Sequence, residues 1–258
     1  MIIDSVLEAA EPLLVGRQVT DAVLGLSLTA VELDGQDIGV SYVLRQNLPA
    51  GCSIFGFAQE IIGKPALEVA SLVVKGHDDA QRGVGMAVIT AATRRLDLPD
   101  EQKTPNPFGL DVRPGDTVGM IGFIPPIAKT LTKIADRVII FDKGISSHGG
   151  EGAAHAYPME LQSELLPECD LMIITGTTLI NSTLEQLLDW SKKAREIVLV
   201  GASTPMIKEA FHGTGVTALA GSWWDATYKQ EMFKRLSLSC GIAHLHEMMI
   251  KKLVPVSD

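Results

Sequence analysis

The sequence predicts an α/β protein in which a Rossmann-like parallel sheet of about five strands follows a smaller α+β domain. Five short apolar runs occupy the C-terminal half, and helical patterns follow most of them. Continuous apolar strands that alternate with helices are typical of a parallel sheet covered on both faces. The N-terminal half instead shows β-rich runs followed by helical patterns. Residues 97–117 hold four prolines among polar residues, which is typical of a linker, so we place the domains at residues 1–112 and 113–258.

The N-terminal half begins with an amphipathic pattern. Residues 4–15 carry an apolar stripe of helical period behind Asp4, a candidate N-cap, and Gly16 is expected to end the helix. Two β-rich runs follow, joined at Asp34-Gly35, a dipeptide that favours a hairpin turn. We therefore expect an antiparallel pair of strands, followed by helices over residues 56–96.

The apolar runs of the C-terminal half are VGMIGF, RVIIFD, LMIITG, EIVLVG and VTALAG. Helical connections are expected between them, including one that begins near Pro205, and residues 228–253 are expected to form a terminal helix. Right-handed crossovers leave few topologies. If the chain crosses back through residues 143–170, the strand order is 2-1-3-4-5, whereas a strand hidden in residues 143–158 would give 3-2-1-4-5 with the same crevice.

Residues 115–144 read as strand, tight loop, helix and strand, the order that opens a nucleotide-binding domain. Dinucleotide-binding loops need glycines so that the backbone can approach a pyrophosphate, but here Pro125-Pro126 removes N–H donors. A nicotinamide dehydrogenase is therefore the least favoured function. Proline suits the first turn of a helix, so we expect this loop to be one wall of a different pocket. Its candidate ligand-binding residues are Gly122, Ile124 and Pro125.

Hydroxyl-rich loops follow the third and fourth strands. The carboxyl ends of parallel strands meet at one edge of a sheet, where such loops can form a polar cleft for an anion. Each loop can equally be a strand-to-helix turn whose hydroxyls only cap the helix. The candidate ligand-binding residues of these loops are Thr175, Gly176, Thr177, Thr178, Asn181, Ser203 and Thr204.

Charged and aromatic side chains complete the candidate pocket. Asp142 ends the second strand about 20 residues after the first loop, where a carboxylate can bind a ribose diol or can be an ordinary turn residue. Arg45 and Arg82 could reach across the domain seam to a carboxylate or phosphate, although solvated charge explains them almost as well. Residues 221–225, GSWWD, could add an aromatic wall or simply cover the core.

Histidines provide a candidate metal site. His148 and His155 flank Glu151 in a glycine-rich segment, and two imidazoles with a carboxylate could bind a divalent metal or move protons. Their spacing matches no compact zinc motif, so an ordinary loop remains the alternative. His244 follows Cys240 by one helical turn, and we expect a structural helix there. The sequence has no GxSxG, P-loop, HExxH or CxxC motif, so nucleophilic or zinc-hydrolase chemistry has no direct support.

Composition limits the partners and the compartment. A net charge of −9 argues against nucleic acid, which requires a basic surface. Three widely spaced cysteines, Cys52, Cys169 and Cys240, suit a reducing cytoplasm, and no apolar run approaches the ~20 residues that span a bilayer. We expect a cytoplasmic protein with a small-molecule ligand, no membrane partner and a tendency to form a homodimer.

The order of these elements, with the stretches VGMIGFIPP, LPECDLMIITGTTLINSTLEQLL and VLVGASTP, resembles the family called "putative heavy-metal chelation". Members of that family pair an enolase-N-terminal-like domain with a Rossmann-like domain. The resemblance covers nearly the whole chain and is most specific in TGTTLINSTLEQLL and GASTP. It implies an active-site cleft between the domains, partial likeness to Rossmann-like methyltransferases, and a role with metal-binding small molecules such as pterins, flavins or metallophores. It supplies no catalytic residues.

The leading hypothesis is a protein that binds, and in one version transforms, an anionic or metal-chelating small molecule between its domains. One alternative is a methyltransferase-like enzyme that uses S-adenosylmethionine with Asp142 on the ribose. Another is a carrier of a divalent metal or a metallophore, with no turnover. The residues do not choose between an enzyme and a binding protein.

Overall fold

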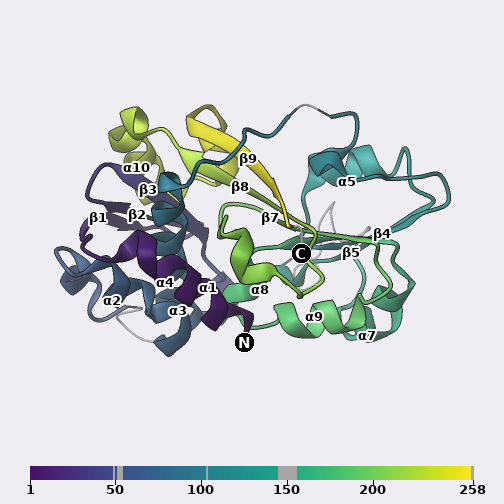
Figure 1. The fold of residues 1–258 in the computed structure, drawn as a ribbon, viewed down its shortest axis with the longest axis horizontal. Helices are drawn as coiled ribbons and strands as arrows, with labels where there is room; N and C mark the ends of the chain where they lie inside the picture. Colours follow the sequence, from purple (N-terminus) through teal and green to yellow (C-terminus); the bar gives the residue numbers. More distant parts are fainter. Residues whose placement is uncertain (49, 51–54, 103, 145–155, 257–258) are drawn as a thin grey trace.

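A computed structural model describes residues 1–48, 50, 55–102, 104–144 and 156–256. It contains a three-stranded sheet in the N-terminal half and a six-stranded sheet in the C-terminal half. Figure 1 shows the first sheet and the early helices gathered on one side of the molecule, with β4 and β5 at the other. The predicted fold class is confirmed. The boundary at residue 112 and the likeness to an enolase N-terminal domain stay predictions.

The three-stranded sheet is antiparallel, in the order β1-β2-β3. Its strands are β1 (Val19–Leu24), β2 (Leu28–Leu33) and β3 (Asp37–Tyr42). The expected antiparallel pair across Asp34-Gly35 is confirmed as β2 and β3, but the first β-rich run turns back on itself and forms two strands where one was expected. The N–H of Gly25 donates to the carbonyl of Leu28 (3.0 Å), and this short turn is hidden within an apolar stretch.

Helices of the N-terminal half pack beside this sheet, and one of them lies directly on it. They are α1 (Ile2–Leu14), η1 (Arg45–Asn47), η2 (Ala58–Ile61), α2 (Ala66–Ala70), α3 (Leu72–Lys75), α4 (Asp79–Ala92) and η3 (Thr93–Arg95), where η marks a 3₁₀-helix. Asp4 lies inside the first turn of α1 and is not its cap. The carboxylate of Asp78 caps α4 by accepting the N–H of Gln81 (2.9 Å). Most residues of α4 are buried, because it packs against β2 and β3 on one side and α2 and α3 on the other.

The six-stranded sheet has the order β5-β4-β6-β7-β8-β9. Its strands are β4 (Thr117–Ile121), β5 (Arg137–Phe141), β6 (Leu171–Thr175), β7 (Glu196–Val200), β8 (Ala218–Trp224) and β9 (Met249–Pro255). The first five are parallel and follow the predicted order 2-1-3-4-5. β9 pairs antiparallel with β8, a strand that the sequence did not predict.

Helical turns connect these strands. They are η4 (Pro107–Gly109), α5 (Pro125–Leu131), η6 (Met159–Leu161), α7 (Gln162–Leu165), η7 (Leu166–Glu168), α8 (Thr177–Ile180), α9 (Leu184–Trp190), η8 (Lys208–Phe211), η9 (Ala226–Tyr228), α10 (Lys229–Ser237) and η10 (Ile242–Met248).

Two of the expected helices are wrong. The chain expected to be one terminal helix is divided into α10, η10 and the edge strand β9. Residues 249–255 form a strand because they pair along β8. The ammonium of Lys252 is almost buried, and it donates to the carbonyl of Leu98 (2.8 Å) and to the carboxylate of Asp100 (2.6 Å). No α-helix begins near Pro205, since one 3₁₀-turn at residues 208–211 replaces it.

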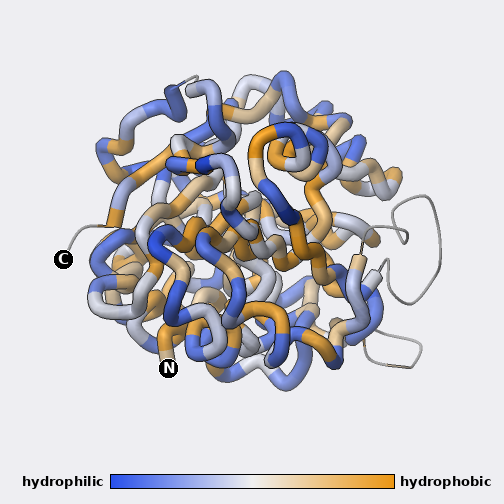
Figure 2. Tube along the Cα trace, turned by 90° about the vertical axis from the view of Figure 1, so that its right-hand side faces the viewer, coloured by the Kyte–Doolittle hydropathy of each residue, from blue (hydrophilic) through white to orange (hydrophobic). Residues whose placement is uncertain are grey.

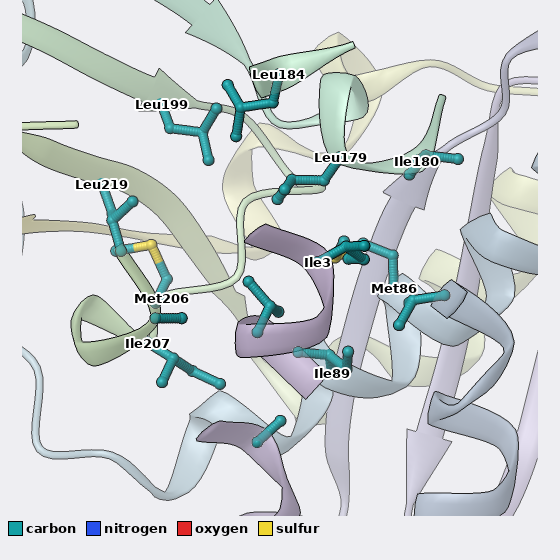
Figure 3. Close-up of a cluster of buried hydrophobic side chains, with 14 of the residues drawn as sticks. Ile3, Met86, Ile89, Leu179, Ile180, Leu184, Leu199, Met206, Ile207 and Leu219 are labelled. Atoms are coloured by element: carbon teal, nitrogen blue, oxygen red, sulfur yellow. The ribbon is translucent and has the colours of Figure 1, made fainter. Parts of the chain in front are cut away.

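Two hydrophobic clusters contain buried side chains from both halves. Figure 3 shows Ile3 of α1 and Met86 and Ile89 of α4 facing Leu179 of α8 and Met206 of the chain after β7. In Figure 2, hydrophobic stretches of the chain cross the middle of the molecule. This packing holds the N-terminal half against the carboxyl ends of the parallel strands. Among the described residues, no helix has the length and apolar character that crossing a bilayer requires.

Candidate functional site

A cavity with a volume of about 640 Å³ lies where the two halves meet. We call it the seam cavity. Its walls are residues 43–47 of the N-terminal half, the chain just after β4, β5 and β6, and parts of η6, α7 and α9. Small-molecule sites have volumes of about 300–1,000 Å³ and favour the carboxyl edge of a parallel sheet. Two other hollows, of 610 and 430 Å³, lie between α1 and α2 and beside β8, away from this edge.

Strand register brings the first loops together. Ile121 of β4 pairs with Phe141 of β5 and with Ile174 of β6, so Gly122, Asp142 and Thr175 follow at the same edge. Gly122 has a φ of +87°, and a Cβ placed on it would lie 3.1 Å from both Cβ and Cγ2 of Thr175. Because only glycine adopts this conformation readily and leaves Thr175 in place, Gly122 lets the two loops approach closely.

Threonine hydroxyls form one side of the cavity. The Thr178 hydroxyl donates to the carbonyl of Thr175 (2.7 Å), and the Thr183 hydroxyl donates to the amide oxygen of Asn181 (2.7 Å). The hydroxyls of Thr175 and Thr177 lie 3.2 Å apart. Only one of the two hydroxyl protons lies in this contact. The hydroxyl that accepts can therefore donate its own proton to another partner. Thr177 and Thr178 are almost fully buried, which fixes this polar wall.

Two cations reach the cavity, one from each half. Arg45 lies in η1 and is exposed, whereas Lys143 follows β5. The Lys143 ammonium donates to the amide oxygen of Asn47 (3.2 Å) across the seam. Positive charge is therefore present at the cavity from both sides.

Asp142 also lies at the cavity. Its carboxylate accepts the N–H of Phe123 (2.8 Å) and the N–H of Gly144 (2.9 Å), so it ties the loop after β4 to the chain after β5. These contacts are those expected of a turn residue. Its predicted contact with a ribose stays a prediction.

Apolar side chains also line the cavity. They are Leu187 and Trp190 from α9, with Phe141 and Ile121 from the ends of β5 and β4. Phe141 is fully buried, whereas Trp190 is partly exposed. Aliphatic and aromatic side chains together with a few polar groups are the usual composition of a site for a small organic molecule.

Seven of the predicted ligand-binding residues line the seam cavity: Arg45, Gly122, Asp142, Thr175, Thr177, Thr178 and Asn181.

Residues 201–204, which we call the GAST loop, lie outside the seam cavity. The hydroxyl oxygen of Ser203 accepts the backbone N–H of Tyr42 (2.9 Å), which joins the two halves. Gly176 packs on the same loop, where an added Cβ would lie 2.8 Å from backbone atoms of Ser203 and Thr204. The Thr204 hydroxyl is buried and has no partner among the described residues. Gly176, Ser203 and Thr204 therefore support the polar wall from outside the cavity.

Three further candidates also lie outside the cavity. Ile124 and Pro125 begin α5, as expected of a proline in a first helical turn. Arg82 donates to the carbonyl of Gly76 (3.2 Å) and to the carboxylate of Asp79 (3.3 Å).

The candidate metal ligands His148 and His155 lie outside the described residues. Within the part of the chain that the structure describes, no group of three or more histidine, cysteine or acidic side chains could hold a metal ion. The segment with His244 is the 3₁₀-helix η10 and not the α-helix expected there.

Buried sulfur and indole groups have structural roles. Burial raises the pKa of the Cys169 thiol to about 12, so this thiol stays protonated at neutral pH. Trp223 and Trp224 lie within β8 and not after it, and both are buried. The Trp223 ring lies 3.9 Å from the Lys252 ammonium and is packed in the sheet, away from the cavity.

Sequence reasoning missed several lining residues, including Asn47, Lys143, Gln186 and Trp190. Lys143 directly follows Asp142 at a strand end, so its position was readable from the sequence. Gln186 and Trp190 lie on a helix, and only the packing of α9 on the sheet shows which of its side chains reach the edge.

Comparisons with known proteins support one family. A family model described as "Putative heavy-metal chelation", DUF364, matches residues 106–255, and a second model with the same description, DUF4213, matches residues 7–93. An uncharacterized protein of Methanocaldococcus jannaschii is 45% identical over 58 residues, which span 22% of this chain and 22% of that protein.

Solved structures share the fold. A DUF364-family protein of unknown function from Pyrococcus horikoshii superposes with a TM-score of 0.81 at 24% identity, over 99% of this chain and 100% of that chain. A second protein of unknown function from the same family, from Desulfitobacterium hafniense, gives a TM-score of 0.76 at 22% identity, over 98% of each chain.

Proposed function

Because this chain belongs to the DUF364 family, described as "Putative heavy-metal chelation", we propose that it binds an anionic, metal-chelating small molecule of the pterin, flavin or metallophore type in the seam cavity. The observation that carries the proposal is the pair of cations at this cavity. Arg45 comes from the N-terminal half and Lys143 from the C-terminal half. A ligand held by both would contact both halves at once.

The chemistry of the walls suits such a ligand. A guanidinium can donate two parallel hydrogen bonds to a carboxylate, and an ammonium binds the same group as a compact charge. In the Thr175–Thr177 pair, the hydroxyl that accepts can donate its own hydrogen bond to a carbonyl or phenolate oxygen of the ligand. The ring of Trp190 and the side chain of Leu187 offer an apolar surface to a flat organic frame.

The side chains that line the cavity bear on whether the protein or its ligand binds the metal. The described polar side chains that line the cavity are hydroxyls, amides, two cations and the carboxylate of Asp142. Heavy metals prefer thiolate and imidazole ligands, whereas hydroxyls, amides and cations bind the polar and anionic groups of organic molecules. In this proposal the chelator carries the metal, and the described side chains of the cavity bind the chelator.

Calorimetric titration with pterin-6-carboxylate tests this proposal. This probe is flat, carries one carboxylate and chelates divalent metals, and it is titrated alone and as its Zn²⁺ complex. We expect one molecule bound per chain, with weaker binding of pterin, which lacks the carboxylate. Affinity should fall as NaCl rises, because exposed charges are screened.

Single substitutions locate the binding. Arg45→Met and Lys143→Met keep an apolar stem and remove the charge, and each should weaken binding about tenfold, the weight of one charge-assisted contact partly exposed to solvent. Lys234→Met is the matched control, since Lys234 is an exposed cation on α10 that does not line the cavity. The proposal is wrong if the wild-type protein binds neither form of the probe, or if all three variants bind it equally.

A further inference from the structure

A buried carboxylate lies just outside the seam cavity. Asp79 is the first residue of α4, and its side chain is only 8% exposed. One of its oxygens accepts from the guanidinium of Arg82 (3.3 Å), and the other accepts from the side-chain amide of Asn47 (2.6 Å). A buried carboxylate needs such partners, so Asp79 holds Asn47 firmly.

Asn47 uses both ends of its amide. Its NH₂ donates to Asp79, and its oxygen accepts from the ammonium of Lys143 (3.2 Å) on the other side of the seam. The reverse orientation would set the oxygen against a carboxylate and the NH₂ against an ammonium. Because both contacts would then be repulsive, the two charged neighbours fix the direction of this amide.

We propose that Asp79 is a positioning residue of the seam cavity, which acts through Asn47 to hold the ammonium of Lys143 at the cavity wall. Asp79 itself does not line the cavity. A lysine side chain is flexible, and holding it before the ligand arrives lowers the entropic cost of binding. The contact also crosses from one half to the other, so the same three residues couple ligand binding to the packing of the halves.

This inference rests on the proposed function for its effect on a ligand, but the placement of Lys143 can be measured without one. Sulfo-NHS-acetate modifies lysines, and peptide mass spectrometry gives the rate for each. Lys143 has a further partner besides Asn47, so we expect a partial release, with modification of Lys143 about threefold faster in Asp79→Asn than in the wild type.

The matched control is Asp78→Asn. It removes the same charge from the neighbouring position, keeps a good N-cap and does not touch Asn47, since Asp78 binds Gln81. Lys143 should react at the wild-type rate in this variant. The almost buried Lys252 reports unfolding, because it reacts quickly only when the fold opens. If Asp79→Asn does not fold, Asn47→Ala at an exposed position breaks the same chain of contacts and should give the same threefold change.

The ligand arm uses pterin-6-carboxylate. Removing a negative charge near the cavity should by simple electrostatics favour an anion, so Asp78→Asn should bind the probe as well as the wild type or slightly better. If Asp79 positions Lys143 through Asn47, Asp79→Asn should instead lower the affinity for the probe, by about three- to tenfold. In a Lys143→Met background the same substitution should change affinity less than twofold, because the group that it positions is gone.

The outcomes are separable. Equal modification rates of Lys143 in Asp79→Asn, Asp78→Asn and the wild type would overturn the inference, whatever the ligand does. A faster rate in Asp79→Asn alone supports it even if the wild-type protein binds no pterin-6-carboxylate, and in that case it is the proposed function that fails. The inference would also be overturned if Asp79→Asn lowered the affinity for the probe as much in the Lys143→Met background as in the wild-type background.

Discussion

Replacing Gly122 with alanine tests whether the edge of the seam cavity depends on a residue without a side chain. The φ of +87° places an alanine in a conformation that costs about 1–2 kcal/mol. The new Cβ would also lie 3.1 Å from Cβ and Cγ2 of Thr175, closer than ordinary van der Waals contact. Displacing Thr175 adds about 1 kcal/mol, the lower end of the cost of overpacking. We therefore expect Gly122→Ala to lower the free energy of unfolding by about 2–3 kcal/mol.

Gly215, just before β8, provides the matched control. Its φ is +89°, and a Cβ placed on it would meet no atom within 4 Å apart from its chain neighbours. Gly215→Ala should therefore lose only the backbone part, about 1–2 kcal/mol. Urea unfolding of both variants gives the difference, and Thr175→Ser in the Gly122→Ala background should recover part of it by removing Cγ2. Binding of pterin-6-carboxylate should weaken in Gly122→Ala but not in Gly215→Ala, since Gly215 does not line the cavity. Equal losses of stability, or no loss at position 122, would refute the close approach to Thr175.

Two further predictions concern titrating groups. The Arg195 guanidinium donates to Asp116 and holds the pKa of that carboxyl below its ordinary value of 3.8. The ion pair therefore stabilises the folded protein fully above pH 3.8, and this stabilisation is lost as pH falls through the lower folded pKa. Asp116→Asn should therefore lower the free energy of unfolding in urea by about 1–2 kcal/mol at pH 7. The difference from the wild type should begin to shrink only below about pH 4 and should vanish below the folded pKa; a gap that persists at still lower pH would contradict the ion pair. Because burial raises the pKa of Cys169 to about 12, iodoacetamide at pH 8 should modify Cys240 well before Cys169 in the native protein and both in urea. Equal native rates would show that Cys169 is accessible.

Much of the C-terminal half could be predicted from sequence alone. The strands β4 to β8 are continuous apolar runs, and such runs form parallel strands because both faces of the sheet are covered. The long connection after β5 then allowed the order 2-1-3-4-5, which placed the loops after β4 and β6 side by side. The meeting of Gly122 and Thr175 at one edge follows from that order.

The rest depended on contacts between distant segments. MIKKLVP mixes apolar and charged residues in a way that suits a helix end as well as a strand, and its pairing with β8 decides the outcome. Loop position also could not separate residues that line the cavity from residues behind it. Ser203 looks like Thr175 in sequence, but it binds the backbone of Tyr42 because the N-terminal half packs there. Asn47 lines the cavity between Asp79 and Lys143, which belong to different halves, so its place could not be predicted from the sequence.

The central claim is that the seam cavity binds an anionic chelator between the two halves. A crystal structure of the protein with the Zn²⁺ complex of pterin-6-carboxylate tests it most directly. We predict the carboxylate between the guanidinium of Arg45 and the ammonium of Lys143, the ring beside Trp190, and the Zn²⁺ ion bound by the pterin. Density for the complex at another surface, with the seam cavity free of it, would contradict the claim.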